Sequence, residues 1–595
     1  MPLQPPPGVH EGTHAPPLHV PPVHAVPLGA SASAGQLALL PSHASAWSHS
    51  PAAARQTTPE PFTRLMHAPA PSHVSCASQP VLVDEPHVVP EPFGEATLSL
   101  HTGAPLPHAT IPFTHAPGFV PHAEPATQGV HAPEPLHTPP EHALPGDFGD
   151  ARLSLQRCKT NTVSNTAFRG FGGPQGMVGI ERVMDAIAGA LGKDPLAVRR
   201  ANFYAPKGES AGSGRSLTPY HMEVEDCIIG ELTDELVRTS EYEKRRAGIR
   251  AWNAKNPVLK RGIALTPVKF GISFTNTLMN QAGALLHLYT DGSLHLNHGG
   301  SEMGQGLFQK VAQVVAEEFQ CDLSNVKITA TRTDKVPNTS ATAASSGSDL
   351  NGMAAREAAR TIKARLAGVL AAEAGVNSSE VQFLPGRIVS GGRNFTLPEA
   401  AALAHAKRVS LSSTGYYATP KIHWDRATGK GRPFFYFAYG AAVTECAIDT
   451  LTGENRMLRV DILHDVGRSL NPAIDLGQIE GGFIQGAGWL TTEELVWDSK
   501  GRLSTHAPST YKIPACSDRP PVMNIALWNG ENSEDTIYRS KAVGEPPLML
   551  GISALLALSD AVASVGGYAG DAALDAPATP ERVLMTVQAV KVKIK

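Results

Sequence analysis

The chain has 595 residues, of which 42% are hydrophobic and only 17% charged, and its formal net charge is -4 with a pI of about 6.7. This length allows several ordinary domains or one very large one. A charge so close to neutral provides no basic field to attract a phosphate backbone, which argues against nucleic acid as a partner.

The first 155 residues form a Pro/His-rich region of low complexity. Residues 1–150 hold 30 of the 50 prolines and 16 of the 24 histidines, and they contain no lysine, tyrosine or asparagine. Proline fixes φ and removes a backbone donor, and little apolar burial is available to offset chain entropy, so we expect disorder. The histidines lie several residues apart among the prolines, which leaves adventitious metal binding as a weaker alternative.

Residues 156–595 have the composition of a folded protein, and their patterns predict interleaved helices and strands, an α+β fold. Residues 173–192 predict an amphipathic helix with Pro174 in its first turn. Its apolar face would consist of Met177, Ile180, Met184, Ile187 and Leu191.

Three further elements follow along the chain. Residues 284–299 alternate apolar and polar positions around an Asp-Gly turn and predict a β-hairpin. Residues 350–375 predict a long helix that ends at Gly375 in a left-handed C-cap. Residues 441–463 predict a second hairpin.

No stretch reaches the roughly 18 apolar residues that span a bilayer, and the chain's first residues lack the features of a signal peptide. The nearest exception, residues 548–558, is followed by Asp560 and predicts a buried helix. The six cysteines form no C-x-x-C pair and no zinc or iron-sulfur spacing. We therefore expect free thiols in a soluble, cytoplasmic protein that has no membrane partner.

Four segments concentrate glycine, small residues or an acid where a regular element would prefer other residues. Residues 166–176 place Arg169 and Phe171 among glycines before a helix, where an anion is favoured. Residues 298–307 precede another amphipathic helix, so we expect exposed amides and Gln305 at its positive end. Tight glycine-rich turns are the alternative for both segments.

In the third segment, residues 340–352, small and hydroxyl residues precede the long helix and could hold a phosphate through backbone N–H groups. Helix capping by Ser348 or Asp349 would explain part of this pattern. In the fourth, residues 541–550, Glu545 stands between a glycine and two prolines ahead of an apolar run. Poor solvation there would raise its pKa, as a general base near pH 7 requires, unless it is an exposed turn residue.

Five ordered blocks resemble the molybdenum hydroxylases, specifically the xanthine dehydrogenases. They are CKTNTVSNTAFRGFGGPQG, NQAGALLHLYTDGSLHLNHGGSEMGQG, VPNTSATAASSGSDLNG, GQIEGGFIQGAGW and YRSKAVGEPPLMLG. The resemblance runs from about Arg157 to the C-terminus and is strongest to molybdenum-binding subunits whose iron-sulfur and flavin domains lie on a separate chain. It implies that residues 156–595 form an incomplete, large molybdopterin-binding domain of α+β class.

The resemblance also implies the roles of the site residues. Glu545 would be the catalytic base, Gln305 would bond near the metal's oxo ligand, and Arg169 would stabilise its loop or the cofactor region. Phe171 and Phe274 would hold a flat purine by stacking and edge contact. The molybdenum would be held by the pterin dithiolene without a protein ligand, and the pterin and its phosphate by Gly304, Gly306, Ala343, Ala344, Ser345, Ser346 and Gln485.

The implied activity is the hydroxylation of hypoxanthine and xanthine to urate, a step of purine catabolism. Electrons would leave through 2Fe-2S centres and FAD on a partner chain to NAD, within a hetero-oligomer. The family's upstream GGGFGG-type loop, and the acid and arginine that orient the purine, have no counterpart in this sequence. Two alternatives follow: a truncated, non-catalytic remnant, or a relative that oxidises aldehydes or other heterocycles.

Overall fold

The structure is a computed structural model that describes residues 31–32, 47–48, 156, 158–160, 162, 166–206, 216–569, 572 and 574–594. The chain divides into two compact units, residues 1–128 and 129–595. In the first unit, strands β1 (Ser31–Ala32) and β2 (Trp47–Ser48) pair antiparallel. The rest of the region for which the sequence predicts disorder lies outside the described residues.

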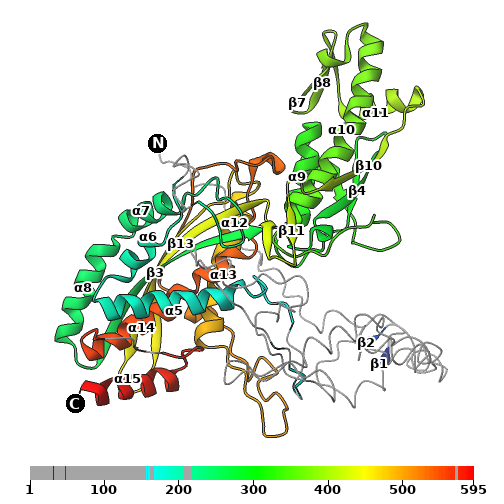
Figure 1. Cartoon of the computed structure of the whole chain (residues 1–595). Coiled ribbons are helices and arrows are strands. Elements are labelled where there is room, and N and C mark those ends of the chain that lie inside the picture. Colours follow the sequence, from blue (N-terminus) through cyan, green and yellow to red (C-terminus); the bar gives the residue numbers. More distant parts are fainter. Residues whose placement is uncertain are drawn as a thin grey trace, which may run out of the picture. The chain divides into compact units, whose positions relative to one another are not determined.

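The second unit interleaves helices and strands, so the predicted α+β class is confirmed (Figure 1). Its described helices are α5 (Gly173–Leu191), α6 (Pro195–Ala201), α7 (Ile229–Thr239), α8 (Tyr242–Lys255), α9 (Leu307–Phe319), α10 (Gly347–Ala374), α11 (Leu397–Ala406), α12 (Pro472–Thr491), α13 (Pro546–Leu550), α14 (Ile552–Ala563) and α15 (Pro580–Ile594). Its described strands are β3 (Leu259–Ile272), β4 (Gln281–Leu288), β5 (Leu294–His298), β6 (Val326–Ile328), β7 (Gln382–Leu384), β8 (Arg387–Ser390), β9 (Arg393–Phe395), β10 (Ser412–Ala418), β11 (His423–Asp425), β12 (Lys430–Arg432), β13 (Tyr436–Asp449), β14 (Asn455–His464) and β15 (Val522–Leu527).

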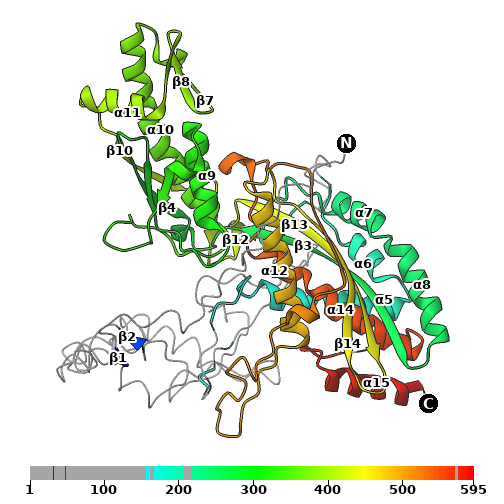
Figure 2. The same ribbon diagram turned by 180° about the vertical axis from the view of Figure 1, so that it is seen from behind.

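The first large sheet has the strand order β15-β14-β13-β3. β13 pairs antiparallel with both β14 and β3, which confirms the hairpin predicted over residues 441–463, and β15 runs parallel to β14. Alternate side chains of β3 enter two different cores: Val268 and Phe270 pack with α12, α13 and α14, whereas Ile263 and Leu265 pack with α7 and α8. Helices therefore cover both faces of this sheet (Figures 1 and 2).

The second large sheet has the order β10-β4-β5-β6. β4 and β5 form the hairpin predicted over residues 284–299. Helices α9 and α10 pack against this sheet through a separate apolar core. The predicted long helix is confirmed as α10, and Gly375 ends it with a φ of 69° in the left-handed region. The hairpins of the two large sheets and helix α10 were thus predictable from local sequence periodicity.

Helix α5 is where it was predicted, but only part of its apolar face is covered. Met177 and Met184 are buried, whereas Ile187 is 40% and Leu191 61% exposed. The predicted amphipathic helix is confirmed, but its apolar face is not covered at Ile187 and Leu191. Periodicity identifies the side of a helix that is apolar, but it cannot determine how far a neighbouring element extends along that side.

The apolar run near the C-terminus lies in α13 and α14, and its leucines are buried. Pro546–Gly566 is the one segment among the described residues that is long and apolar enough to cross a membrane, with a mean hydropathy of 1.9. Of that stretch, 78% is buried inside the protein. The prediction of a buried core helix is confirmed.

Helices α12 and α13 approach each other very closely at Gly486. A Cβ atom at Gly486 would lie only 1.9 Å from the carbonyl oxygen of Leu548. This contact fixes the start of α13, at which Glu545 occupies the N-cap position.

We predict that Gly486→Val will lower the free energy of unfolding by about 3 kcal/mol, because α13 has to move away from α12. Urea denaturation of the full chain would measure the change. Gly477→Ala is the control on the same helix, because a Cβ there meets no atom within 4 Å. Equal stability of the two variants would contradict the close-packing interpretation.

Candidate cofactor and active site

Arg169 joins three segments that are far apart in the sequence. Its Nε donates to the carbonyl oxygen of Gly544, its Nη1 to Oε1 of Gln485 at 3.2 Å, and its Nη2 to Oε1 of Gln478 at 3.1 Å. Burial lowers the pKa of Arg169, and the nearby Glu545 opposes this shift. The guanidinium therefore ties the loop that follows residue 166 to α12 and to the loop that carries Glu545.

Glu545 is half-buried and held from two sides. Its Oε1 accepts the backbone N–H of Gly170 at 3.1 Å, and its Oε2 accepts the hydroxyl proton of Ser345 at 2.8 Å. The Ser345 Oγ in turn accepts the backbone N–H of Glu545 at 2.8 Å. Burial raises the pKa of Glu545, while Ser345, Gly170 and Arg169 act in the opposite direction. This is the poorly solvated carboxyl that the sequence predicts, not an exposed turn residue.

Ala344 and Ser345, in the loop before α10, have two consecutive positive φ angles of 54° and 55°. Among the described residues, neither backbone N–H has a hydrogen-bond acceptor. Non-glycine residues persist in this conformation only when their surroundings enforce it, and such sites cluster around ligands. The loop thus presents two adjacent free donors next to Glu545, which fits an anionic or polar ligand.

Capping by Ser348 or Asp349 does not explain this loop. Ser346 occupies the N-cap position of α10 and makes no side-chain cap bond; its hydroxyl donates to the carbonyl oxygen of Ala343 at 3.2 Å. Asp349 is buried and faces Tyr436 instead. The capping alternative is therefore wrong.

The amides before α9 already have an acceptor within their own loop, which the sequence analysis missed. The carboxylate of Glu302 accepts three backbone N–H groups, those of Gly304, Gly306 and Phe308, at 3.0, 2.9 and 2.9 Å. The prediction of exposed amides at this helix start is wrong for this structure. An acid a few residues before a helix start, as Glu302 is before Leu307, is a recognisable signal for such self-capping.

Gln305 is also occupied by its own loop. Its Nε2 donates to the carbonyl oxygen of Ser301 at 2.8 Å, and its Oε1 accepts the backbone N–H of Met303. The same loop is joined to the next one, because the backbone N–H of Ser301 donates to Oγ1 of Thr342 at 2.8 Å. The glycine-rich loop therefore lies beside the Ala344 loop, and its Gln305 side chain bonds backbone groups of its own loop.

The two predicted substrate-binding phenylalanines do not pair in this structure. Phe171 is half-buried in the loop next to Gly170, with a φ of 36°. Phe274 is 3% exposed, and Asn280 bonds both its N–H and its carbonyl group. Among the described aromatic rings no direct contact joins the two. The bond from Gly170 to Glu545 brings the loop of Phe171 to the Glu545 region, and the substrate roles of both phenylalanines remain predictions.

The predicted residues fall into two groups. Glu545, Ser345, Arg169 and Gln485 form one hydrogen-bonded cluster that includes segments from four of the five blocks. The glycine-rich loop is connected to that cluster through Thr342. The predicted convergence of separated loops on Glu545 is therefore visible in the described residues.

We predict that Ser345→Ala will move the acid limb of any Glu545-dependent activity to higher pH. The hydroxyl stabilises the ionised carboxylate, so its loss raises the pKa of Glu545 further. Turnover on the acidic side of the optimum should fall about tenfold. Ser346→Ala is the matched control because its hydroxyl bonds Ala343 instead. A pH–rate profile that is unchanged in Ser345→Ala would contradict this role.

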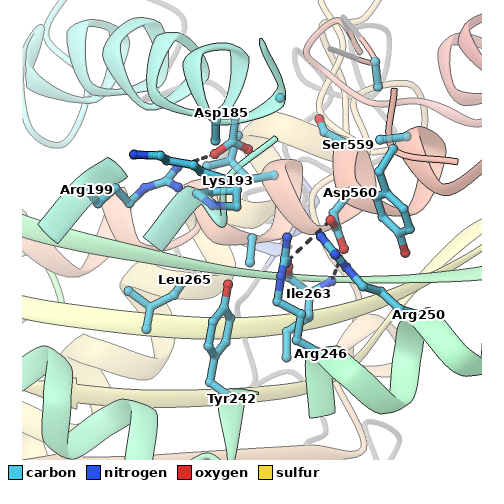
Figure 3. Close-up of a pocket in the computed structure, with 18 of the residues that line it drawn as sticks. Asp185, Lys193, Arg199, Tyr242, Arg246, Arg250, Ile263, Leu265, Ser559 and Asp560 are labelled. Atoms are coloured by element: carbon cyan, nitrogen blue, oxygen red, sulfur yellow. Dashed lines mark hydrogen bonds and ion pairs between the residues drawn. The ribbon is translucent and has the colours of Figure 1, made fainter. Parts of the chain in front are cut away.

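A separate cavity of about 170 Å³ lies among α5, α8, α14 and β3 (Figure 3). Two of its arginines pair with acids: Arg199 bonds Asp185 at 2.7 Å, and Arg246 bonds Asp194 at 2.7 Å and Asp560 at 3.5 Å. No predicted site residue lines it. These ion pairs connect α5, α6, α8 and α14, so we assign them a role in stabilising the packing of these helices.

Two families described as molybdopterin cofactor-binding domain match the chain, over residues 145–203 and 235–520. Among solved structures, CO dehydrogenase from Oligotropha carboxidovorans superposes with a TM-score of 0.62 at 21% identity, covering 72% of this chain and 53% of that one. Quinoline 2-oxidoreductase from Pseudomonas putida 86 gives 0.61 at 22% identity, covering 71% and 53%. The chain belongs to the molybdopterin-binding molybdenum hydroxylases.

Within that class, its curated relatives are xanthine dehydrogenases, which are oxidoreductases. The enzyme of Oryza sativa subsp. japonica is 43% identical over 449 residues, and that of Mus musculus is 42% identical over 454 residues. These alignments cover 74% and 75% of this chain but 31% and 32% of the relatives. The chain therefore spans about a third of the length of the relatives that it matches.

Proposed function

We propose that the chain is the molybdenum-cofactor part of a xanthine dehydrogenase-type hydroxylase that oxidises hypoxanthine and xanthine to urate. The observation that carries this proposal is the Glu545 carboxyl, which is desolvated and lies next to the free amides of Ala344 and Ser345. The identity with xanthine dehydrogenases supports the purine over an aldehyde or another heterocycle.

In the proposed mechanism, molybdenum–molybdopterin supplies the two-electron oxidation at the ring carbon when it is bound. The N–H groups of Ala344 and Ser345 would donate to acceptor groups of the cofactor, and the amide of Gln485, which Arg169 holds, would help to bind it. The Glu545 carboxylate acts as the base and takes a proton. Its raised pKa makes it a stronger base than an ordinary glutamate, which favours this transfer. The bond from Ser345 keeps Oε2 in place while this occurs.

We also propose that the electrons pass to an iron-sulfur/FAD subunit and then to NAD, in the cytoplasm. The described cysteines support a reducing compartment because all are free thiols: Cys158, Cys227, Cys321, Cys446 and Cys516. Phe171 follows Gly170, whose N–H bonds Glu545, and we assign Phe171 and Phe274 to contact with a flat ring.

The test is to purify the full chain from a host that makes the cofactor, and to measure molybdenum and pterin per chain together with turnover. The proposal expects one of each per chain, and oxidation of xanthine with an artificial electron acceptor in preference to acetaldehyde. A folded chain without molybdenum would overturn the proposal and favour the non-catalytic alternative. Faster oxidation of acetaldehyde would overturn the purine assignment.

A further inference from the structure

The hydroxyl of Tyr436 lies between the two segments that hold the candidate base. Tyr436 begins β13 and is only 3% exposed. Its hydroxyl donates to Oδ2 of Asp349 at 2.7 Å and accepts the backbone N–H of Ala542 at 2.9 Å. Burial raises the pKa of Tyr436 well above its ordinary value, so the hydroxyl keeps its proton and remains the donor.

Both partners of this hydroxyl are close in sequence to the Glu545–Ser345 pair. Asp349 lies in the first turn of α10, four residues after Ser345, and Ala542 is three residues before Glu545. The contacts therefore close a ring: Glu545 bonds Ser345, the first turn of α10 leads to Asp349, and Tyr436 returns to the Glu545 loop. One hydroxyl thus sets the spacing between the carboxyl and the serine that orients it.

Nothing else in the proposed mechanism uses this pair. Asp349 is buried, and burial raises its pKa to about 7, against the opposing effects of Tyr436 and Lys310. A buried carboxyl is costly unless its partners compensate for the lost solvation. This buried pair bonds the loop that carries Glu545 through the N–H of Ala542.

We propose that Tyr436 and Asp349 are positioning residues that hold Glu545 and Ser345 in register for proton transfer. The inference rests on the proposed function for its catalytic meaning, but the positioning itself is a property of the chain. Tyr436→Phe removes the hydroxyl and keeps the ring in its core. Asp349→Asn keeps an acceptor for the hydroxyl and should rescue the arrangement, whereas Asp349→Ala should not.

The first measurement is amide hydrogen exchange of the full chain, which needs no activity. In Tyr436→Phe and Asp349→Ala, exchange should speed up about tenfold at the hydrogen-bonded amides of residues 541–545 and at those of Ser346 and Leu350, because both loops lose their common anchor. Asp349→Asn should stay within about twofold of the parent. Tyr242→Phe is the matched control, because it removes a buried hydroxyl that faces Asp194 at 3.5 Å, away from Glu545. Unchanged exchange in Tyr436→Phe and Asp349→Ala would overturn the inference.

The second measurement is steady-state kinetics with xanthine. Tyr436→Phe should lower kcat about 10- to 100-fold with KM within about twofold, as expected for a base that is displaced while binding is retained. Asp349→Asn and Tyr242→Phe should keep kcat. Faster exchange with an unchanged kcat would overturn the positioning role. If the parent chain binds no molybdenum and turns over no purine, the proposed function fails, while the exchange result still decides whether the pair anchors Glu545.

Discussion

Glu545→Gln is expected to lower the turnover of xanthine about 10³-fold while the chain stays folded and binds its cofactor. The amide oxygen can still accept the N–H of Gly170, and the amide NH2 can donate to Ser345 Oγ in a reversed bond, so the loop keeps two contacts while the ability to take a proton is lost. The measurement is kcat at saturating xanthine, together with molybdenum per chain. A loss below about fivefold would exclude Glu545 as the base.

The matched control is Glu493→Gln, which also removes a carboxylate whose pKa is raised by burial. Glu493 accepts the hydroxyl of Tyr511 and takes no part in the Glu545 cluster. Its substitution should leave kcat unchanged. An equal loss in both variants would mean that buried carboxylates matter for folding and not for proton transfer.

The pH dependence of the same reaction follows from the sign of the shift. A base must be ionised to accept a proton, so the rate rises with pH through the pKa of Glu545. An ordinary glutamate has a pKa of about 4.3. Burial raises the pKa of Glu545, so the acid limb of the rate profile lies at a higher pH than that value. Glu545→Gln should remove this limb from the kcat profile.

The largest expected effect on stability is that of Lys541→Met, which should cost about 3–5 kcal/mol. The Lys541 ammonium is buried and lies 2.9 Å from Oδ2 of Asp226 and 2.8 Å from Oδ2 of Asp465. Its removal leaves two carboxylates facing each other without a counterion. Because Lys541 is four residues before Glu545, turnover should fall as well. Urea denaturation monitored by circular dichroism would give the free energy.

Lys421→Met is the control for Lys541→Met. Lys421 bonds Glu534 at 2.8 Å, but its side chain is 58% exposed, so the loss should stay below about 1 kcal/mol. In addition, Asp226→Asn combined with Lys541→Met should recover part of the stability, because one of the unpaired charges is removed. Similar losses for the two lysine variants would contradict the role assigned to burial.

Elements defined by local patterns could be predicted from the sequence. Both hairpins and helix α10 follow from side-chain periodicity and from an Asp-Gly turn or a glycine C-cap, which act over a few residues. Glu545 could be singled out because two prolines and an apolar run follow it. The extent of burial along α5 could not be predicted, because the exposure of Ile187 and Leu191 depends on packing with distant segments.

The sequence identified residues of the candidate site, but it could not predict which hydrogen bonds these residues make. Glu302 and Gln305 accept different backbone N–H groups of one loop, and which group each side chain reaches depends on how the loop closes. The Tyr436–Asp349 bond joins residues 87 positions apart that have no common motif. Such pairs are set by sheet register and helix placement, which no single segment of sequence encodes.

The bond from Arg169 to the carbonyl of Gly544 spans 375 positions of the chain. At the usual pace of translation, of about 5–20 residues per second, roughly 20 to 75 s separate the synthesis of these two partners. During that interval the arginine has left the ribosome without its anchor. The Glu545 cluster is therefore completed only when the C-terminal helices emerge, so we expect a cofactor to be loaded after synthesis and not during it.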